Sequence, residues 1–408
     1  MRKFNFIDLF AGCGGLSEGF YQTGYNSLAH VEIDSTACKT LRTRMNYYKY
    51  KDSDIRVLEK DITEEDILEK LDYIIDKKEI DVIIGGPPCQ AYSSLGRAKD
   101  KDSMQNDPRN YLFESYVKIL NHYLPKFFVF ENVIGLLTAK IKGKYIFDKI
   151  VEVLSENYNI ITNPNIIVLN SVNYGVPQIR KRVIIIGVRK DINFTPNDIY
   201  ESIKKTHYAP DDSEIERKKL KKYITVREAI EELPPLLPGE GKSLIEFISK
   251  NDNEFLKKIT SAKSTILRDH VARNHNDKDI ERYKYMSKNK WTFTELLEKR
   301  KDLEHPKKRV FNNSYTVQWW DLPSKTIIAH LYKDGNQFIH PDYRQGRTLT
   351  VREVARLQSF PDDFIFEGPR TEQYKQIGNA VPPFLAKAIA KAIKEKLKKI
   401  EGDKQIDI

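Results

Sequence analysis

The chain has 408 residues, which is enough for two or three domains with a sizeable core. Hydrophobic residues make up 40% and charged residues 31%. This composition is typical of soluble globular proteins, and no run of 18 apolar residues predicts a membrane-spanning helix. The net charge of +10 fits a polyanionic partner about as well as an ordinary Lys-rich surface. Three cysteines without a C-x-x-C pair predict neither a disulfide framework nor a metal site, and they favour a cytoplasmic protein.

The N-terminal half alternates short apolar strands with helical stretches. Most of the strands are continuous apolar runs, which is typical of strands covered on both faces of a parallel sheet. Helices are expected between them, around Tyr111–Tyr123 and Lys144–Ser155. The order predicts a doubly wound, mostly parallel α/β domain over residues 1–190. The expected strands are Phe4–Phe10, Ser27–Val31, Ile80–Ile84, Phe127–Phe130, Ile166–Leu169 and Val183–Val188.

This rhythm breaks after residue 190. Residues 191–222 are polar and irregular, and a Pro-rich stretch follows at 234–239. Regular patterns return only with a helix at Val351–Phe360. We therefore expect residues 191–375 to form a second, smaller and irregular domain.

One segment of that domain, 281–310, carries ten Lys or Arg and five Asp or Glu. Aromatic residues are interleaved with these charges, at Tyr283, Tyr285, Trp291 and Phe293. Aromatics among basic residues suit a nucleic-acid surface, but a solvated charged face explains this segment alone at least as well.

The C-terminal segment returns to the first domain. Apolar residues recur on one stripe of a helix over Phe384–Ile400, and the opposite face is rich in Lys. We expect this helix to dock on the α/β domain, so that residues 376–408 complete it.

The first strand runs into a glycine-rich turn at residues 10–15. Glycines between a strand and a helix let a ligand approach the backbone closely. Glu32, at the end of the second strand, has the spacing of an acid that binds ribose hydroxyls. Position 17 is Ser, not the third Gly of a dinucleotide motif, so a nucleoside cofactor fits better. Asp61 would be near an adenine amino group, although an Asp there is more often a loop residue.

The next two strands end in residues with acid–base and nucleophilic chemistry. Pro87 and Pro88 fix the backbone before Cys89, which favours a positioned nucleophile over an inert buried thiol. Glu131 follows the neighbouring strand, where apolar surroundings would raise its pKa and let it act as an acid. Alternation would turn Arg180 and Arg182 to one face, where they bind a carbonyl oxygen or a phosphate, or simply carry surface charge.

Taken in order, these motifs resemble those of DNA (cytosine-5)-methyltransferases, in particular the single-chain bacterial members. Two later blocks of the chain extend the resemblance, which runs from Phe4 to the C-terminus with a divergent interval near residues 191–320. The matching motifs are Phe10-Ala11-Gly12-Cys13-Gly14-Gly15, Gly86-Pro87-Pro88-Cys89-Gln90, Glu131-Asn132-Val133, Gln178-x-Arg180-x-Arg182, Arg347-x-Leu349-Thr350-x-Arg352-Glu353 with Arg356-Leu357-Gln358, and Gln376-x-Gly378-Asn379-Ala380-Val381.

The resemblance implies a role for each matching residue. Cys89 is the nucleophile, Glu131 contacts the N3 edge of the base, and Asn132 supports the loop that carries Cys89. Arg180 and Arg182 hold the base. Residues implied to bind S-adenosylmethionine are Phe10, Gly12, Cys13, Gly14, Glu32, Ile33, Asp61, Ile62, Pro88, Leu112, Asn379 and Ala380. Ile33 departs from the aromatic residue that some relatives carry beside the adenine.

The expected function is therefore S-adenosylmethionine-dependent methylation of cytosine C5 in a specific double-stranded DNA sequence. By family analogy, the enzyme would be a monomer that protects host DNA from a cognate restriction endonuclease. Two alternatives stay open. One is a tRNA cytosine-5 methyltransferase built on the same motifs, and the other is a non-catalytic DNA-binding paralogue.

Overall fold

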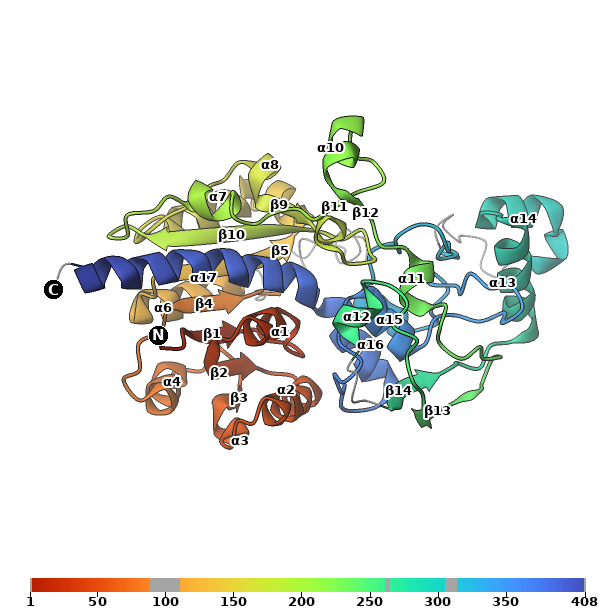
Figure 1. Cartoon of the computed structure of the whole chain (residues 1–408), viewed down its shortest axis with the longest axis horizontal. Helices are drawn as coiled ribbons and strands as arrows, with labels where there is room; N and C mark the ends of the chain where they lie inside the picture. The colour runs from red at the N-terminus through yellow and green to blue at the C-terminus, as the bar shows by residue number, and fades with distance from the viewer. Residues whose placement is uncertain (1, 89–110, 261–264, 305–313, 407–408) are drawn as a thin grey trace. The chain divides into compact units, whose positions relative to one another are not determined.

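A computed structural model of the chain describes residues 2–88, 111–260, 265–304 and 314–406. Contacts divide the chain into two compact units (Figure 1). The first comprises residues 1–170, 181–204 and 383–408, and the second comprises residues 171–180 and 205–382. Over the described ranges, the structure has no helix that is both long and apolar enough to cross a membrane.

The first unit is built on an eight-stranded sheet in the order β3-β2-β1-β4-β5-β10-β8, with β9 also paired to β10. The first five strands in this order are parallel, and β10 runs antiparallel to β5, β8 and β9. Four of the parallel strands, β1, β2, β4 and β5, are buried on both faces over most of their length, as their continuous apolar runs predict. The strands are β1 (Asn5–Leu9), β2 (Asn26–Glu32), β3 (Val57–Glu59), β4 (Val82–Gly85), β5 (Phe127–Val133), β8 (Tyr158–Asn159), β9 (Val168–Asn170) and β10 (Lys181–Arg189), with a separate hairpin of β6 (Lys140–Ile141) and β7 (Lys144–Tyr145).

The strand expected at Ile166–Leu169 is only half correct. Residues Pro164–Ile167 form a short helix, α8, and the strand β9 begins at Val168. Pro164 is at the first turn of this helix, and the Asn163 side chain accepts a hydrogen bond from the backbone N–H of Asn165. A capped N-terminus with Pro in its first turn is a helix start signal, and it outweighs the β-branched residues that follow.

Helices of the first unit surround the sheet, and α17 runs alongside α1 (Figure 1). Their backbones approach closely at Gly19, where a Cβ atom would lie 2.3 Å from the backbone nitrogen of Lys387. The predicted apolar stripe of α17 is buried at Leu385, Ile389 and Ile393. The helices are α1 (Gly15–Gln22), α2 (Ser35–Tyr47), α3 (Ser53–Arg56), α4 (Ile67–Ile75), α6 (Leu112–Tyr123), η3 (Ile134–Thr138), α7 (Ile146–Leu154), α8, α9 (Pro196–Tyr200) and α17 (Pro383–Ile406).

The second unit consists of short helices, small two-stranded sheets and long connections, in agreement with the irregular pattern of its sequence. Its strands pair as β11 (His207–Tyr208) with β12 (Lys221–Lys222) and β13 (Gly241–Glu246) with β14 (Ile266–Val271). Its helices are η4 (Ser171–Tyr174), α10 (Glu214–Lys219), α11 (Val226–Ile230), α12 (Leu256–Ile259), α13 (Asp277–Asn289), α14 (Phe293–Lys299), η5 (Lys301–Leu303), η6 (Ala329–Tyr332), α15 (Val351–Leu357) and α16 (Arg370–Asn379).

The aromatic residues of the basic segment are not a stacking surface. Tyr283 and Phe293 are almost fully buried in the core that α13 and α14 form with Tyr315, and the rings of Phe293 and Tyr315 stack at 4.5 Å. Tyr285 and Trp291 pack against the same core. These aromatics therefore hold the two helices together and are not available to stack on nucleic-acid bases, so they do not support the nucleic-acid interpretation of this segment.

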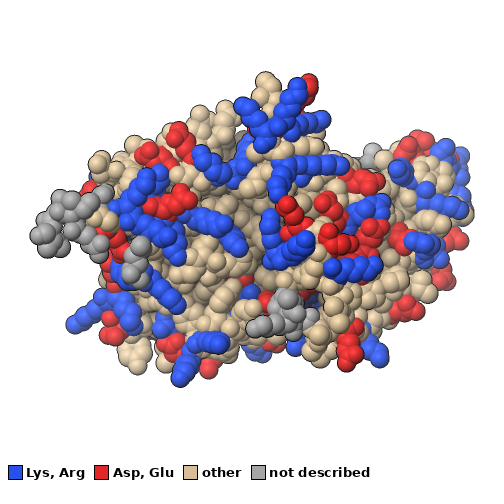
Figure 2. Space-filling model, in the orientation of Figure 1, with Lys and Arg blue, Asp and Glu red and all other residues tan. Residues whose placement is uncertain are grey.

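Basic side chains also gather around α10 and β12 (Figure 2). Helix α10 buries none of its residues. Two of the lysines there are paired with acids: Lys218 with Glu214 at 3.0 Å, and Lys221 with Glu254 at 2.7 Å.

The block that begins at Arg347 is a buried ionic network. Thr350 and Glu353 form a capping box at the start of α15. Both oxygens of the Glu353 carboxylate accept hydrogen bonds from Arg347, at 2.7 and 2.8 Å. Arg356 is fixed in the same way by Asp362, at 2.7 and 3.0 Å. These residues hold α15 in the core of the second unit.

Candidate active site

The carboxyl ends of four neighbouring strands form one row of residues. In the sheet register, Leu9 pairs with both Val31 and Gly85, and Gly85 pairs with Phe130. The next residue on each strand therefore stands at the same edge of the sheet, which places Phe10, Glu32, Gly86 and Glu131 in one row. Three strand spacings separate Glu32 from Glu131, a span on the order of 14 Å.

The glycine-rich turn after β1 has a left-handed backbone at three positions. Phe10, Gly12 and Gly14 all have positive φ angles, of 58°, 54° and 86°. Gly14 is the N-cap of α1. A Cβ atom on Gly12 would meet no atom within 4 Å, so the turn is open on this side and leaves room for a ligand against the backbone.

Glu32 anchors this turn. Its Oε2 accepts a hydrogen bond from the Gly12 N–H at 2.7 Å, and its Oε1 accepts from the N–H groups of Ile33 and Asp34, both at 2.9 Å. Burial raises the pKa of this carboxyl above its ordinary value, and the three N–H donors act in the opposite direction. A carboxylate has about four acceptor sites, so about one remains for a further donor such as a ribose hydroxyl.

The surroundings of Glu32 suit a nucleoside. Ile33 leaves 66% of its surface exposed at the sheet edge, which offers an apolar face to a flat ring. Pro88 and Leu112 are partly exposed. Of two other residues with an implied role, Ile62 is buried, and Asp61 Oδ1 accepts hydrogen bonds from the backbone and hydroxyl of Thr63 at 2.9 and 2.7 Å. In the described structure Asp61 thus stabilises its own turn.

The two cysteines within the described ranges are poor nucleophiles. Cys13 and Cys38 are buried, and desolvation raises the pKa of each thiol to about 12. The reactive form of cysteine is the thiolate, which is scarce at neutral pH for a thiol of such high pKa. Cys89, the predicted nucleophile, lies outside the described residues.

The segment that leads to Cys89 is fixed by the end of β5. The Asn132 side-chain amide donates to the Pro87 carbonyl at 3.2 Å. Glu131 forms an ion pair with Arg182, whose Nε lies 2.9 Å from its Oε1, and each side chain is only 13% exposed. A Cβ atom on Gly86 would lie 2.7 Å from Glu131 Oε2, so only glycine lets the carboxylate lie this close to the backbone there. Glu131 and the segment that leads to Cys89 are therefore held close to each other.

Arg180 is placed differently from Arg182. Strand β10 begins at Lys181, so the alternation expected across residues 178–182 does not apply. Arg180 belongs to the second unit, is buried, and donates to the carbonyls of Ile327 and Gly378 at 2.5 and 3.0 Å. Asn379 is exposed and Ala380 is buried at the end of α16, also in the second unit.

Sequence reasoning gave no role to a buried polar cluster under the glycine-rich turn. Asp8, in the middle of β1, is almost fully buried, and Ser17 donates to it at 2.5 Å. Burial raises the pKa of Asp8 to about 8 and lowers that of the nearby His30 to about 3. A carboxyl group within an apolar strand that is covered on both faces was the signal in the sequence.

Comparison with known proteins identifies the family of this chain. The family described as C-5 cytosine-specific DNA methylase matches residues 4–395. The chain belongs to this family. It is a DNA cytosine-5 methyltransferase, as the order of its motifs predicted.

The most similar relatives include bacterial enzymes of one kind. The methyltransferase is 35% identical to the Type II methyltransferase M.Bpa9945I of Bacillus paralicheniformis, over 95% of this chain and 98% of the relative. It is 37% identical to the Type II methyltransferase M.DdeI of Desulfomicrobium norvegicum, over 95% and 88%. These matches confirm the resemblance to bacterial restriction–modification enzymes.

Solved structures confirm the fold class of the methyltransferase. A prophage-encoded protein of E. coli, described as a DNA modification methyltransferase, aligns with a TM-score of 0.70 and 25% identity over 97% of this chain and all of that one. The Dnmt2 methyltransferase of S. pombe aligns with a TM-score of 0.54 and 14% identity over 98% and 99%, and shares the fold.

Proposed function

We propose that the methyltransferase transfers a methyl group from S-adenosylmethionine to C5 of a cytosine within a specific sequence of double-stranded DNA. The observation that carries this proposal is the row of residues at the sheet edge. One end has the open glycine turn and Glu32 for a nucleoside. The other end has Glu131, held by Arg182 beside the segment that leads into Cys89. The cofactor supplies the methyl group as a sulfonium.

Cys89 has the central role in the proposed chemistry. Its thiolate adds to C6 of the cytosine, and the electron pair of the C5–C6 double bond moves toward C5. In its protonated form, Glu131 donates a hydrogen bond to N3 and transfers its proton there, which limits the negative charge on the ring. Arg182 holds this carboxyl group in place. The C5 carbon then takes the methyl group as the bond between the methyl carbon and the sulfonium sulfur breaks. Finally C5 gives up its proton to water, N3 returns its proton to Glu131, and the C6–S bond breaks to release the Cys89 thiolate.

The target cytosine must leave the duplex before this reaction, at a cost of roughly a few kcal/mol. The second unit, with its irregular connections, would provide the contacts that recognise the sequence. Given the Type II names of the relatives, we further propose that methylation protects DNA from an endonuclease that cuts the same sequence.

The test is a trapped adduct. Fluorine at C5 cannot leave as a cation, so DNA with 5-fluorocytosine at the target should stay bound to Cys89 after methyl transfer. With S-adenosylmethionine present, we expect a complex that survives denaturing electrophoresis. Cys89→Ser should abolish it, whereas Cys38→Ala should retain it, because Cys38 is a buried thiol with a raised pKa.

Two results would contradict the proposal. An adduct that maps by mass spectrometry to a residue other than Cys89 would refute the assignment of the nucleophile. Methyl incorporation into tRNA in place of DNA would refute the substrate.

A further inference from the structure

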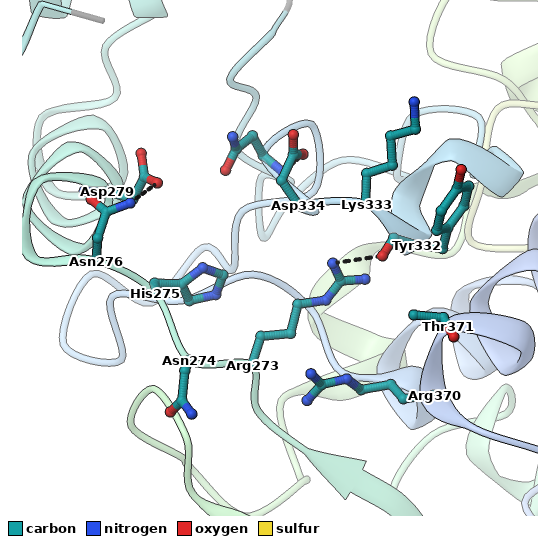
Figure 3. Close-up of a pocket in the computed structure, with 11 residues that line it drawn as sticks. Arg273, Asn274, His275, Asn276, Asp279, Tyr332, Lys333, Asp334, Arg370 and Thr371 are labelled. Atoms are coloured by element: carbon teal, nitrogen blue, oxygen red, sulfur yellow. Dashed lines mark hydrogen bonds between the residues drawn. The ribbon is translucent and has the colours of Figure 1, made fainter. Parts of the chain in front are cut away.

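The second unit contains a pocket of about 330 Å³ that the proposed chemistry does not use. Its lining comes from residues 273–276 after β14, Asp279 of α13, residues 332–336 from the end of η6 onward, and the first residues of α16 (Figure 3). All of these belong to the second unit. We call it the basic pocket, after Arg273, Lys333 and Arg370.

The charge of the basic pocket is not balanced by its own acids. None of its three cations has a carboxylate within ion-pair distance among the residues that the structure describes. Of the two acids that line it, Asp279 pairs with Arg282 at 2.7 Å and accepts from the Tyr315 hydroxyl at 2.7 Å. The other, Asp334, accepts from the Asn336 N–H at 3.0 Å, so three cations stand against one carboxylate that has no cation partner. In contrast, Lys218 of α10 and Lys221 of β12 have acidic partners.

The histidine of the pocket adds no charge. His275 has a pKa lowered to about 4, mainly by burial and next by Arg273, so the imidazole is neutral at physiological pH. The pocket is thus positive around Lys333 and Arg370.

Arg273 is a fixed donor at the floor of the pocket. It is only 6% exposed, and its guanidinium donates to the carbonyls of Leu331 and Tyr332 at 2.6 and 3.3 Å (Figure 3). Its Cζ lies 4.2 Å from the ring centre of Tyr374. Its Nε–H is buried and has no hydrogen-bond acceptor among the described residues. A buried cation without a counter-ion is costly, and an anion in the pocket would reduce that cost.

The start of α16 supports the same ligand class. The helix is ten residues long, its N-cap is Pro369, and no side chain caps this end. The first N–H groups of a helix have no partner within the helix, and its dipole favours an anion there. Arg370 and Thr371, the first two residues of α16, line the pocket with a guanidinium and a hydroxyl (Figure 3).

We propose that the basic pocket binds a phosphate group, and specifically one phosphodiester of the DNA backbone. A tetrahedral oxyanion uses such a combination of guanidinium, ammonium, hydroxyl and helix N-terminus. The contact would fix the position of the second unit on DNA without reading sequence. This inference rests on the proposed function, because it takes DNA as the substrate.

The test uses Lys333→Gln/Arg370→Gln, which changes two exposed residues and leaves Arg273 in place. Binding to duplex DNA is measured by fluorescence anisotropy over a range of salt concentrations. Each phosphate contact contributes about 0.9 to the slope of log K against log salt. Because two cations share one phosphate, we expect the slope to fall by about one unit, with a higher KM for DNA and little change in kcat. Lys257→Gln/Lys258→Gln, on α12 outside the pocket, removes the same charge and should leave the slope nearly unchanged.

Three outcomes would overturn the inference. These are an unchanged slope in the pocket variant, an equal loss in the α12 variant, or calorimetric binding of inorganic phosphate that the pocket variant loses while its DNA slope is kept. The last result would assign the pocket to free phosphate. Methylation of DNA by the wild-type protein is measured in parallel. If the wild-type protein does not methylate DNA, the proposed function fails; if it does and the slope of the pocket variant is unchanged, only the pocket proposal fails.

Discussion

Glu32→Gln tests the cofactor end of the site with an isosteric change. The carboxylate accepts three backbone N–H bonds and has about one acceptor site left. In the variant, we expect the amide oxygen to accept the hydrogen bonds from the N–H groups of Ile33 and Asp34, because both donors point to the same oxygen. The new NH₂ then faces the Gly12 N–H, so the glycine turn loses its anchor and the ribose hydroxyl loses its acceptor.

The expected loss of affinity for S-adenosylmethionine follows from the hydrogen bonds that the variant cannot make. A hydrogen bond to a charged acceptor contributes about 1.5–3 kcal/mol, which corresponds to a Kd for S-adenosylmethionine raised roughly 10- to 150-fold. Calorimetric titration measures it, with a thermal melt to show that the variant is folded. Glu59→Gln is a matched control, because Glu59 pairs with Glu32 in the sheet register but is exposed and bound to Arg42. A Kd for the Glu32 variant within threefold of this control would refute the placement of the ribose.

Three other predictions concern the acid, the buried carboxyl and the second unit. Gly86→Ala should lower kcat at least tenfold, because its Cβ displaces the Glu131 carboxylate; an unchanged rate of methyl incorporation would contradict this. Asp8 has a pKa of about 8 in the fold against 3.8 ordinarily, so stability to urea should fall as pH rises from about 4 to 8. Asp8→Asn should flatten that dependence, and an equal slope in the variant would refute it. Exchanging residues 191–345 with those of a relative of different specificity should change the methylated sequence in bisulfite sequencing, and an unchanged sequence would contradict the domain assignment.

The central strands β1, β2, β4 and β5 could be predicted because they are buried on both faces, whereas the short, partly exposed edge strands β3 and β8 were missed. Apolar runs such as Phe127–Phe130 that alternate with helices are typical of buried strands in a parallel sheet. The carboxyl ends of such strands lie at the same edge of the sheet, which places Glu32 and Glu131 there. Local signals were weaker where capping competes with strand propensity, as at Pro164. Spacing alone also could not show that Tyr283 and Phe293 face a core, because charged residues lie among the buried positions of both α13 and α14.

The candidate site was predicted in part. The positions of Glu32, Glu131 and Asn132 follow from strand ends, and Arg182 follows from the register of the antiparallel strand. Arg180 has the same charge two residues earlier, but it belongs to another compact unit, where it binds two carbonyls. The boundary between the two units lies between Arg180 and Lys181, and so short an interval has no change in composition that would reveal it. The assignments of Cys89 as the nucleophile, and of the second unit as the part that recognises the DNA sequence, stay predictions.

The docking of α17 on α1 has a consequence for how the protein is made. The helix that follows the glycine turn packs at Gly19 against Ala386 and Lys387, and the Tyr25 hydroxyl donates to the Ala390 carbonyl at 3.1 Å. These partners are separated by more than 360 residues of sequence, so they meet only after almost the whole chain has left the ribosome. The first unit therefore cannot be complete until α17 is synthesised, which happens after residues 205–382 of the second unit. A nascent chain that stops before residue 383 lacks the cover of α1, and we expect translation to be complete before S-adenosylmethionine can bind.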